Sequence, residues 1–321
     1  MVYDFEQPII ELEAKINELQ RFASEKGIDL SREIENLEKR ARELKQTIYG
    51  QLTPWQKVLI ARHPERPNTL DYINMLCTDF IEFHGDRCFG DDPAILGGIA
   101  RFRGRAVTVI GHLKGHDTRE NLARNFGMAH PEGYRKALRL MRQAEKFKRP
   151  VITFIDTPGA YPGMGAEERG QAHVIALCIS GMLALRVPVI SVIMGEGGSG
   201  GALALAAGDR ILMQEHAIFS VISPEAYATI LWKDASRCRD AAGVMKITAQ
   251  DLHARQLVDE VIPEPLGGAH RDKKEAARMM GEVIARHLEE LLNHPADELI
   301  KRRHARFRSI GPEYLPGNNI T

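Results

Sequence analysis

Residues 187–202 read VPVISVIMGEGGSGGA, an apolar run that passes directly into a cluster of glycines. The run Val187–Met194 is continuously hydrophobic rather than alternating, which is typical of a strand covered on both faces in a parallel sheet. A short apolar segment after the glycines, up to Gly208, predicts a helix. Strand, loop and helix in this order indicate an α/β protein.

The same alternation extends outward in both directions. The run 151–155 predicts a strand that ends in a Pro/Gly loop at 156–165, and a helix is expected from about 166 to 185. Further strands are expected at 210–213 and 217–222, and a hairpin at 98–110. Pro131 can open a helix to about Lys148 whose second face is basic. From residue 52 to the hairpin, Pro54, Pro64 and Pro67 indicate an irregular chain, and residues after about 270 predict charged helices.

The first fifty residues have a different pattern. Apolar residues recur at spacings of three and four along two segments, with Gly27 between them. This pattern predicts an antiparallel helical hairpin. Because two helices alone leave much of their apolar stripes uncovered, we expect the hairpin to serve as an assembly arm.

Composition narrows the possible classes. The chain has 321 residues, of which 44% are hydrophobic and 27% charged, and 43 basic side chains balance 43 acidic ones. This balance argues against binding nucleic acid through bulk charge. No run reaches the roughly 18 apolar residues of a membrane span, and the acidic N-terminus lacks a signal peptide's apolar core. We therefore expect a cytoplasmic protein. The four cysteines are widely spaced, which disfavours a disulfide framework or a zinc site: Cys77, Cys88, Cys178 and Cys238.

The loop at 195–202 is the strongest candidate for chemistry. Its glycines allow a ligand to approach the backbone closely. Amide groups at the start of a helix have no intrahelical acceptor and carry positive partial charge. The loop therefore predicts a site that stabilises an anion, and one interpretation is an oxyanion hole built from peptide N–H groups.

Two other motifs overlap there. Residues 195–200 match the dinucleotide fingerprint G-x-G-x-x-G, with Glu215 at the place of a ribose-binding acid, although the following helix is short. Residues 197–201 match the nucleophile elbow G-x-S-x-G. Its partners would be among the acids and histidines downstream: Asp209, Asp234, Asp251, His253 and His270. Because glycines separate Ser199 from the expected strand end, we favour a helix cap for Ser199 over a nucleophile.

The loop at 156–165 leaves a parallel-type strand at its carboxyl end, where α/β folds bind ligands. It is either part of the site or a rigid crossover. Asp156 is a possible general base. His112 and His116 have a spacing that suits metal ligands only on a helix, and a strand is expected there, so no metal site is predicted.

Several long blocks resemble one family, the alpha subunit of the carboxyltransferase of multi-subunit bacterial acetyl-CoA carboxylase. The blocks span nearly the whole chain: DFEQPI (4–9), ARHPERP (61–67), GDR (85–87), NFGM (125–128), PEGYRKALRLM (131–141), DTPGAYPG (156–163), GEGGSGGALA (195–204), VISPE (221–225) and IPEPLGGAH (262–270). One departure is His116, where we expect the family to carry arginine.

The resemblance implies a crotonase-like fold, a spiral of ββα units. It also implies three regions: a helical hairpin at 1–51, a carboxyltransferase domain at 52–270, and C-terminal helices at 271–321 that pack on or extend the domain. The implied activity is transfer of the carboxyl group from carboxybiotin to acetyl-CoA, which gives malonyl-CoA, the first committed step of fatty acid synthesis.

The resemblance also implies the partners and the site. A separate beta subunit would share the active site in an alpha2beta2 complex, biotin would be attached to a carrier protein, and ATP would be used by a biotin carboxylase. Gly200 and Gly201 would form, through their amides, an oxyanion hole for the biotin ureido oxygen. The expected substrate-binding residues lie in the two loops and on the basic helix face: Gly197, Gly198, Gly159, Ala160, Tyr161, Gly163, Arg135 and Lys136. The alternatives are a stand-alone acyl-CoA hydratase or isomerase and a serine hydrolase that uses Ser199.

Overall fold

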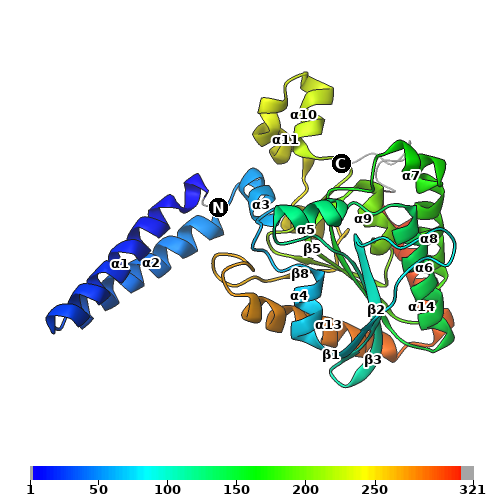
Figure 1. Cartoon of the computed structure of the whole chain (residues 1–321), viewed down its shortest axis with the longest axis horizontal. Helices are drawn as coiled ribbons and strands as arrows, with labels where there is room; N and C mark the ends of the chain where they lie inside the picture. The colour runs from blue at the N-terminus through cyan, green and yellow to red at the C-terminus, as the bar shows by residue number, and fades with distance from the viewer. Residues whose placement is uncertain (1–2, 312–321) are drawn as a thin grey trace.

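A long helical hairpin projects from the body of the molecule in the computed structural model, which describes residues 3–311 (Figure 1). Its helices are α1 (Gln7–Lys26) and α2 (Ser31–Gly50), as the apolar spacing predicts. Gly27 ends α1 with a φ of 63°, a left-handed conformation that glycine adopts without steric cost.

The base of this arm is fixed to the body by apolar and polar contacts. Ile9 and Tyr49 are buried against Ile60 of the body. The carboxylate of Glu6 accepts hydrogen bonds from the Tyr49 hydroxyl at 2.5 Å and from Arg271 at 3.2 Å. The arm therefore has a defined attachment, while its distal part lies in solvent.

The body is built on an eight-stranded mixed sheet in the order β1-β2-β3-β4-β5-β6-β8, with β7 paired to β5. β1, β2 and β3 are antiparallel, and the pairs from β3 through β8 are parallel. The strands are β1 (Cys77–Glu82), β2 (Ile95–Phe102), β3 (Arg105–His112), β4 (Val151–Thr157), β5 (Val189–Gly198), β6 (Arg210–Gln214), β7 (Ile218–Ser220) and β8 (Glu260–Ile262).

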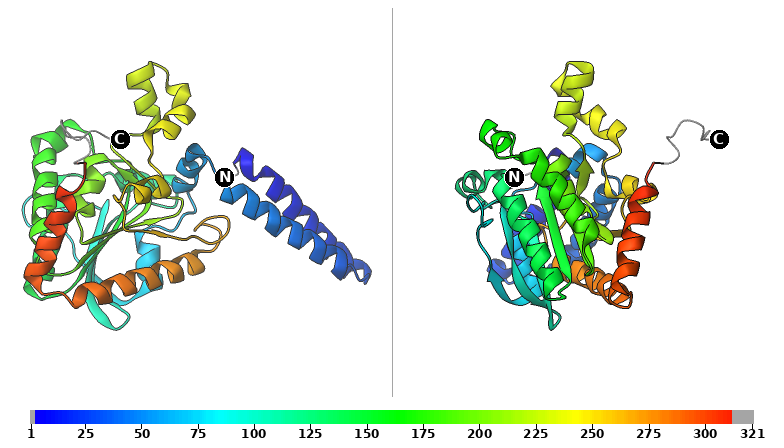
Figure 2. Two further views of the ribbon diagram at one scale, coloured as in Figure 1. Left: turned by 180° about the vertical axis from the view of Figure 1, so that it is seen from behind. Right: turned by 90° about the vertical axis from the view of Figure 1, so that its right-hand side faces the viewer.

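Helices cover both faces of the sheet, which explains why the central strands are continuously apolar (Figures 1 and 2). On one face, α6 (Pro131–Lys146), α8 (Gln171–Ala184) and α9 (Ser199–Ala206) share a buried core with β4 and β5. On the other, α4 (Thr69–Leu76) and α13 (Lys273–Leu292) form a second core. The last described helix, α14 (Ala296–Arg308), packs beside α8.

Shorter helices complete the body: α3 (Pro54–Ala61), α5 (Thr118–Ala123), α7 (Met164–Glu168), α10 (Pro224–Trp232), α11 (Cys238–Met245) and α12 (Ala249–Ala254). Helices α10 and α11 form a lobe at the top of Figure 1 that packs on α3. None of the helices within residues 3–311 is both long and apolar enough to cross a membrane.

Three sequence expectations are wrong in detail. The chain from residue 52 to the hairpin is not irregular, because Pro54 opens α3 and two further elements, α4 and β1, precede β2. The helix expected at 166–185 is divided by Gly170, whose φ is 82°. Strand β5 does not end at Met194 but continues through the glycines to Gly198.

Candidate active site

The glycine segment forms a tight strand-to-helix turn. Residues 196–198 of β5 pair with β7, so the strand ends at Gly198 and α9 begins at Ser199. Ser199 has a φ of 53°, a conformation that is uncommon for residues other than glycine. The expectation that Ser199 caps the helix is wrong, since Gly198 occupies the cap position and no side-chain cap bond forms.

The turn presents unpaired backbone donors. Gly200 and Gly201 are the second and third residues of α9, so their N–H groups have no acceptor within the helix. Among residues 3–311, no loop or side-chain acceptor for either N–H is found. Gly200 is half-buried and Gly201 is buried. Two neighbouring amides with positive partial charge are thus available to an anionic ligand.

The loop after β4 contacts this turn directly. A methyl group placed on Gly198 would lie 2.1 Å from the Pro158 carbonyl oxygen, and one on Gly201 would lie 2.6 Å from the Ala160 nitrogen. Only glycine fits at these two positions, because any side chain would overlap the backbone of the loop after β4. The Ala160 N–H also finds no acceptor among the described residues. The loops at 156–165 and 195–202, both candidates from the sequence, are therefore in contact, and each contributes amides without an acceptor.

Side-chain contacts hold the loop after β4 in place. The Gly159 N–H donates to the Thr157 hydroxyl at 3.1 Å, and the Tyr161 N–H donates to the Ala129 carbonyl at 3.0 Å. The Tyr161 ring stacks on His130 with 4.0 Å between centroids. Gly163 lies against the Tyr161 ring, where a methyl group would approach within 2.4 Å.

Arg135 and Lys136 lie on α6 and form ion pairs within the chain. Arg135 pairs with Asp86 at 2.6 Å and with Glu132 at 2.8 Å. Lys136 is 1% exposed and pairs with Asp91 at 2.6 Å. Both cations are paired with carboxylates of the same chain, so this geometry gives no support to the expectation that they bind substrate.

The residues of the rival interpretations do not assemble into a second site. Within the described residues, no histidine or carboxylate is hydrogen-bonded to Ser199, as a hydrolase triad requires. The carboxylate of Glu215 accepts the Glu264 N–H at 3.1 Å. Burial lowers the pKa of His112 to about 3, and His116 pairs with Asp71 at 2.9 Å. No group of three or more metal-binding side chains is found in residues 3–311.

An ion network that could not be identified from the sequence lies at the strand ends from which the two loops begin. Lys114, just after β3, pairs with Asp156 at 2.7 Å and with Glu196 at 3.0 Å. Arg62 pairs with Glu196 at 2.6 Å and with Glu225 of α10 at 2.6 Å. Burial disfavours the charged form of Glu196, but Lys114 and Arg62 outweigh it and lower its pKa to about 2. Asp156 is thus an ion-pair partner rather than a free general base.

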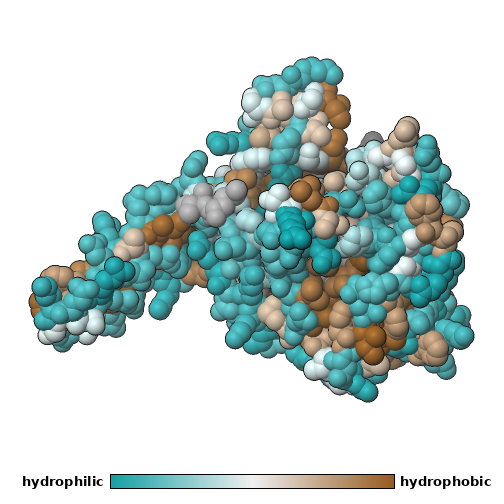
Figure 3. Space-filling view, viewed as in Figure 1, coloured by the Kyte–Doolittle hydropathy of each residue, from teal (hydrophilic) through white to brown (hydrophobic). Residues whose placement is uncertain are grey.

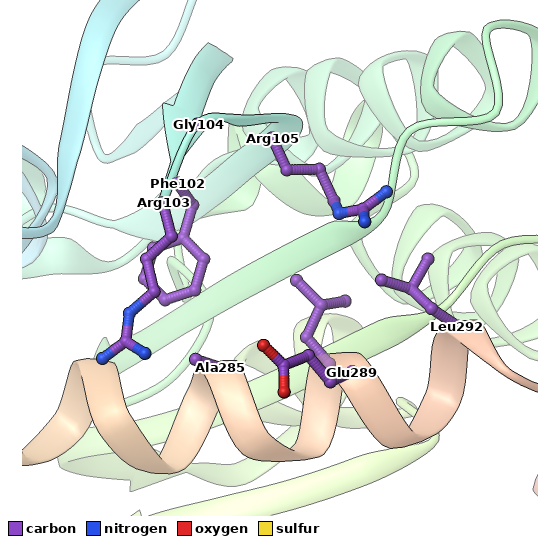
Figure 4. Close-up of a pocket in the computed structure, with 8 residues that line it drawn as sticks. Phe102, Arg103, Gly104, Arg105, Ala285, Glu289 and Leu292 are labelled. Atoms are coloured by element: carbon purple, nitrogen blue, oxygen red, sulfur yellow. The ribbon is translucent and has the colours of Figure 1, made fainter.

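Two cavities lie at opposite ends of the strands. One, of about 320 Å³, is lined by Arg62, Lys114, Asp156 and Glu196 next to the loops. The other, of about 510 Å³, lies between the β2–β3 turn and α13, with Glu289 on the helix beneath the turn (Figure 4). Since β3 runs parallel to β4 and β5, that turn is at the edge away from the glycines. Only the first cavity adjoins the candidate site.

Comparison with known proteins identifies the family to which the chain is related. The family model described as acetyl co-enzyme A carboxylase carboxyltransferase-like matches residues 2–311. The chain belongs to this family. It is 58% identical over 316 residues to the acetyl-coenzyme A carboxylase carboxyl transferase subunit alpha of Carboxydothermus hydrogenoformans, covering 98% of both chains. It is 59% identical over 308 residues to the subunit of that name from Heliobacterium modesticaldum, covering 96% of this chain and 92% of the relative.

Solved structures share the fold of the family at low sequence identity. A Pseudomonas malonate decarboxylase hetero-tetramer chain has a TM-score of 0.58 and 17% identity, covering 77% of this chain and 98% of that chain. A transcarboxylase 12S chain has a TM-score of 0.54 and 20% identity, covering 67% of this chain and 41% of that chain. The predicted crotonase-like α/β fold is confirmed, and the resemblance stated from the sequence blocks is confirmed by the family match.

Proposed function

We propose that this chain is the alpha subunit of an acetyl-CoA carboxylase carboxyltransferase, which moves a carboxyl group from carboxybiotin to acetyl-CoA to give malonyl-CoA. The family match and the names of its relatives support this activity over a hydratase, an isomerase or a hydrolase. The observation that carries the mechanism is the set of unpaired amides at Gly200 and Gly201, joined by that of Ala160.

These amides suit the charge that the reaction generates. Biotin supplies a carboxylated ureido nitrogen, and release of the carboxyl group places negative charge on the ureido oxygen. The N–H groups of Gly200 and Gly201 would donate hydrogen bonds to that oxygen and stabilise the charge more in the transition state than in the ground state. Removal of one such donor typically costs about 2.7–4 kcal/mol, or 10²–10³ in rate.

Proton transfer requires no side-chain base in this proposal. The ureido anion left after N–C cleavage would accept a proton from the methyl group of acetyl-CoA, and the resulting enolate carbon would attack the released CO2 to form the new C–C bond of malonyl-CoA. The absence of a base is supported by the ion pairs of Asp156 and Glu196, the carboxylates at the ends of β4 and β5, with Lys114. The chain then acts by binding and orienting the reacting groups and by placing amide dipoles.

The site is expected to be completed by a beta subunit. Leu203 of α9 and Leu177 of the neighbouring α8 are 46% and 39% exposed, and Ile230 and Leu231 are each 57% exposed on the α10–α11 lobe. Uncovered apolar residues also mark the arm and the lobe in Figure 3. Apolar surface around an open site is typical of a subunit interface. The relatives are named as one subunit, and one structural neighbour is a hetero-tetramer.

We further propose the remaining parts of the system. Biotin would be attached to a separate carrier protein, and a biotin carboxylase would charge it with the use of ATP. Two alpha and two beta subunits would assemble, and the N-terminal arm would contribute to this assembly.

Malonyl-CoA decarboxylation with free biotin, the reverse half-reaction, tests the proposal. We expect turnover when the chain is combined with a beta subunit and little turnover by either subunit alone. A chain that hydrates or isomerises acyl-CoA without a partner, or a pair of subunits that assembles but does not decarboxylate malonyl-CoA, would refute it.

A further inference from the structure

Three consecutive parallel strands end in charged residues that contact one another behind the glycine turn. Lys114 follows β3, Asp156 is near the end of β4, and Glu196 lies in the last part of β5. Oδ1 of Asp156 accepts hydrogen bonds from Lys114 Nζ at 2.7 Å and from the Glu196 N–H at 2.9 Å. One lysine therefore connects the bases of both loops that carry the free amides.

Beyond Asp156 and Glu196, no side-chain pair links the two loops to each other among the described residues. The residues that meet are glycines and backbone atoms: Gly198 against Pro158, and Gly201 against Ala160. A methyl group on Gly195 would lie 2.4 Å from Asp156 Oδ1, so the carboxylate is packed against the strand just before the turn. The ion network lies four or five residues before these amides and, together with the pairing of Thr157 with Gly197, holds the ends of β4 and β5 at a fixed separation.

The free-energy cost of burying these charged side chains argues that the network does more than stabilise the fold. The side chains of Lys114, Asp156 and Glu196 are 18%, 9% and 11% exposed. Buried ion pairs often contribute no net stability relative to apolar residues of similar size, and their best-attested role is to specify one arrangement. Arg62 adds a second cation to Glu196 and extends the network to Glu225 of α10.

We infer that Lys114 is a positioning residue for carboxyl transfer: its ammonium group holds Asp156 and Glu196 together and so sets the spacing of the oxyanion amides. It acts through the two loops and does not touch the reacting atoms. This inference rests on the proposed function. A displacement of about 1 Å in such a site can cost 10²-fold in rate.

The test is kinetic and uses the reconstituted complex with its beta subunit. For Lys114→Ala we expect kcat for malonyl-CoA decarboxylation to fall at least tenfold, with KM changed less than threefold and assembly unchanged. Because the 320 Å³ cavity adjoins Lys114, ethylammonium or propylammonium added to this variant should restore kcat in a saturable manner. A merely structural lysine would not respond in this way.

A matched control is Arg278→Ala, which removes exposed ion pairs with Glu275 at 2.6 Å and Glu282 at 2.5 Å on α13. We expect no change in kcat and no effect of the amines. If Lys114→Ala does not fold, Asp156→Asn tests the inference instead, because asparagine keeps an acceptor for the Glu196 N–H while weakening the contact with Lys114. A loss in kcat of at least threefold is expected.

Unchanged kcat in a folded variant, or a loss in Lys114→Ala that amines do not restore, would overturn the inference while leaving the proposed function intact. Absence of turnover by the wild-type complex would instead refute the proposed function.

Discussion

Replacement of Gly201 by alanine is the sharpest perturbation of the proposed oxyanion site. The added methyl group would lie 2.6 Å from the Ala160 nitrogen and the Gly159 carbonyl carbon, and 2.9 Å from the Tyr134 hydroxyl. The loop after β4 must move by roughly 0.8 Å to bring the closest contacts to an ordinary 3.4 Å. Since a shift near 1 Å can cost 10²-fold, we expect kcat to fall by about 100-fold.

Gly200→Ala is the matched control in the same turn. Its methyl group would lie 3.7 Å from two carbon atoms of Ile175, an ordinary contact. We expect kcat within threefold of wild type and an unfolding free energy unchanged or raised by about 0.4–1 kcal/mol, because alanine restricts the unfolded chain.

The assay is malonyl-CoA decarboxylation by the assembled subunits, with circular dichroism and co-elution to verify folding and assembly. If folded Gly201→Ala turns over within threefold of wild type, or if both variants lose activity equally, the spacing of the two loops does not control catalysis.

Three further predictions concern stability. Tyr134→Phe should leave the unfolding free energy unchanged or raise it by up to about 1–3 kcal/mol, because the buried hydroxyl has no partner among the described residues; a loss of more than 1 kcal/mol in urea unfolding would show that the hydroxyl is bonded. Burial lowers the pKa of His112 and His270 to about 3, so below about pH 6.5 the unfolded state binds more protons than the folded state. The unfolding free energy should therefore be full above about pH 6.5 and fall toward pH 3 by up to about 1.4 kcal/mol per pH unit for each group. His112→Phe should reduce this slope, and an unchanged slope would contradict the role of His112. Arg303→Met should cost about 3–5 kcal/mol by leaving buried Asp209 unpaired, since Arg303 donates to both its carboxylate oxygens at 2.9 and 2.7 Å; a loss below 1 kcal/mol would be inconsistent with the pair.

Local periodicity was sufficient to predict much of the fold. The helices of the arm, α6 and the buried strand β4 follow from apolar spacing in the sequence. The end of β5 could not be predicted in this way, because glycines usually interrupt strands. Here residues 196–198 stay extended because β7, a partner distant in sequence, pairs with them.

The candidate site was predicted in part. The two glycine-containing loops were identifiable, because helix starts and strand ends are local features, whereas the choice of the Gly200 and Gly201 amides followed from the family resemblance. The network around Lys114 was not predicted, although Lys114, Asp156 and Glu196 each follow or end a strand, and parallel pairing brings such strand ends together. Lys136 was expected to bind substrate from the basic helix face but is buried and paired with Asp91, which comes from a loop that periodicity cannot place.

The position of the biotin ureido oxygen in a crystal structure of the complex between this chain and its beta subunit tests the central claim most directly. We predict that this oxygen lies 2.7–3.1 Å from the amide nitrogens of Gly200 and Gly201, the range expected for an oxyanion hole. A ureido oxygen bound by a side chain, or beyond 4 Å from both nitrogens, would contradict the proposal that backbone amides receive the charge.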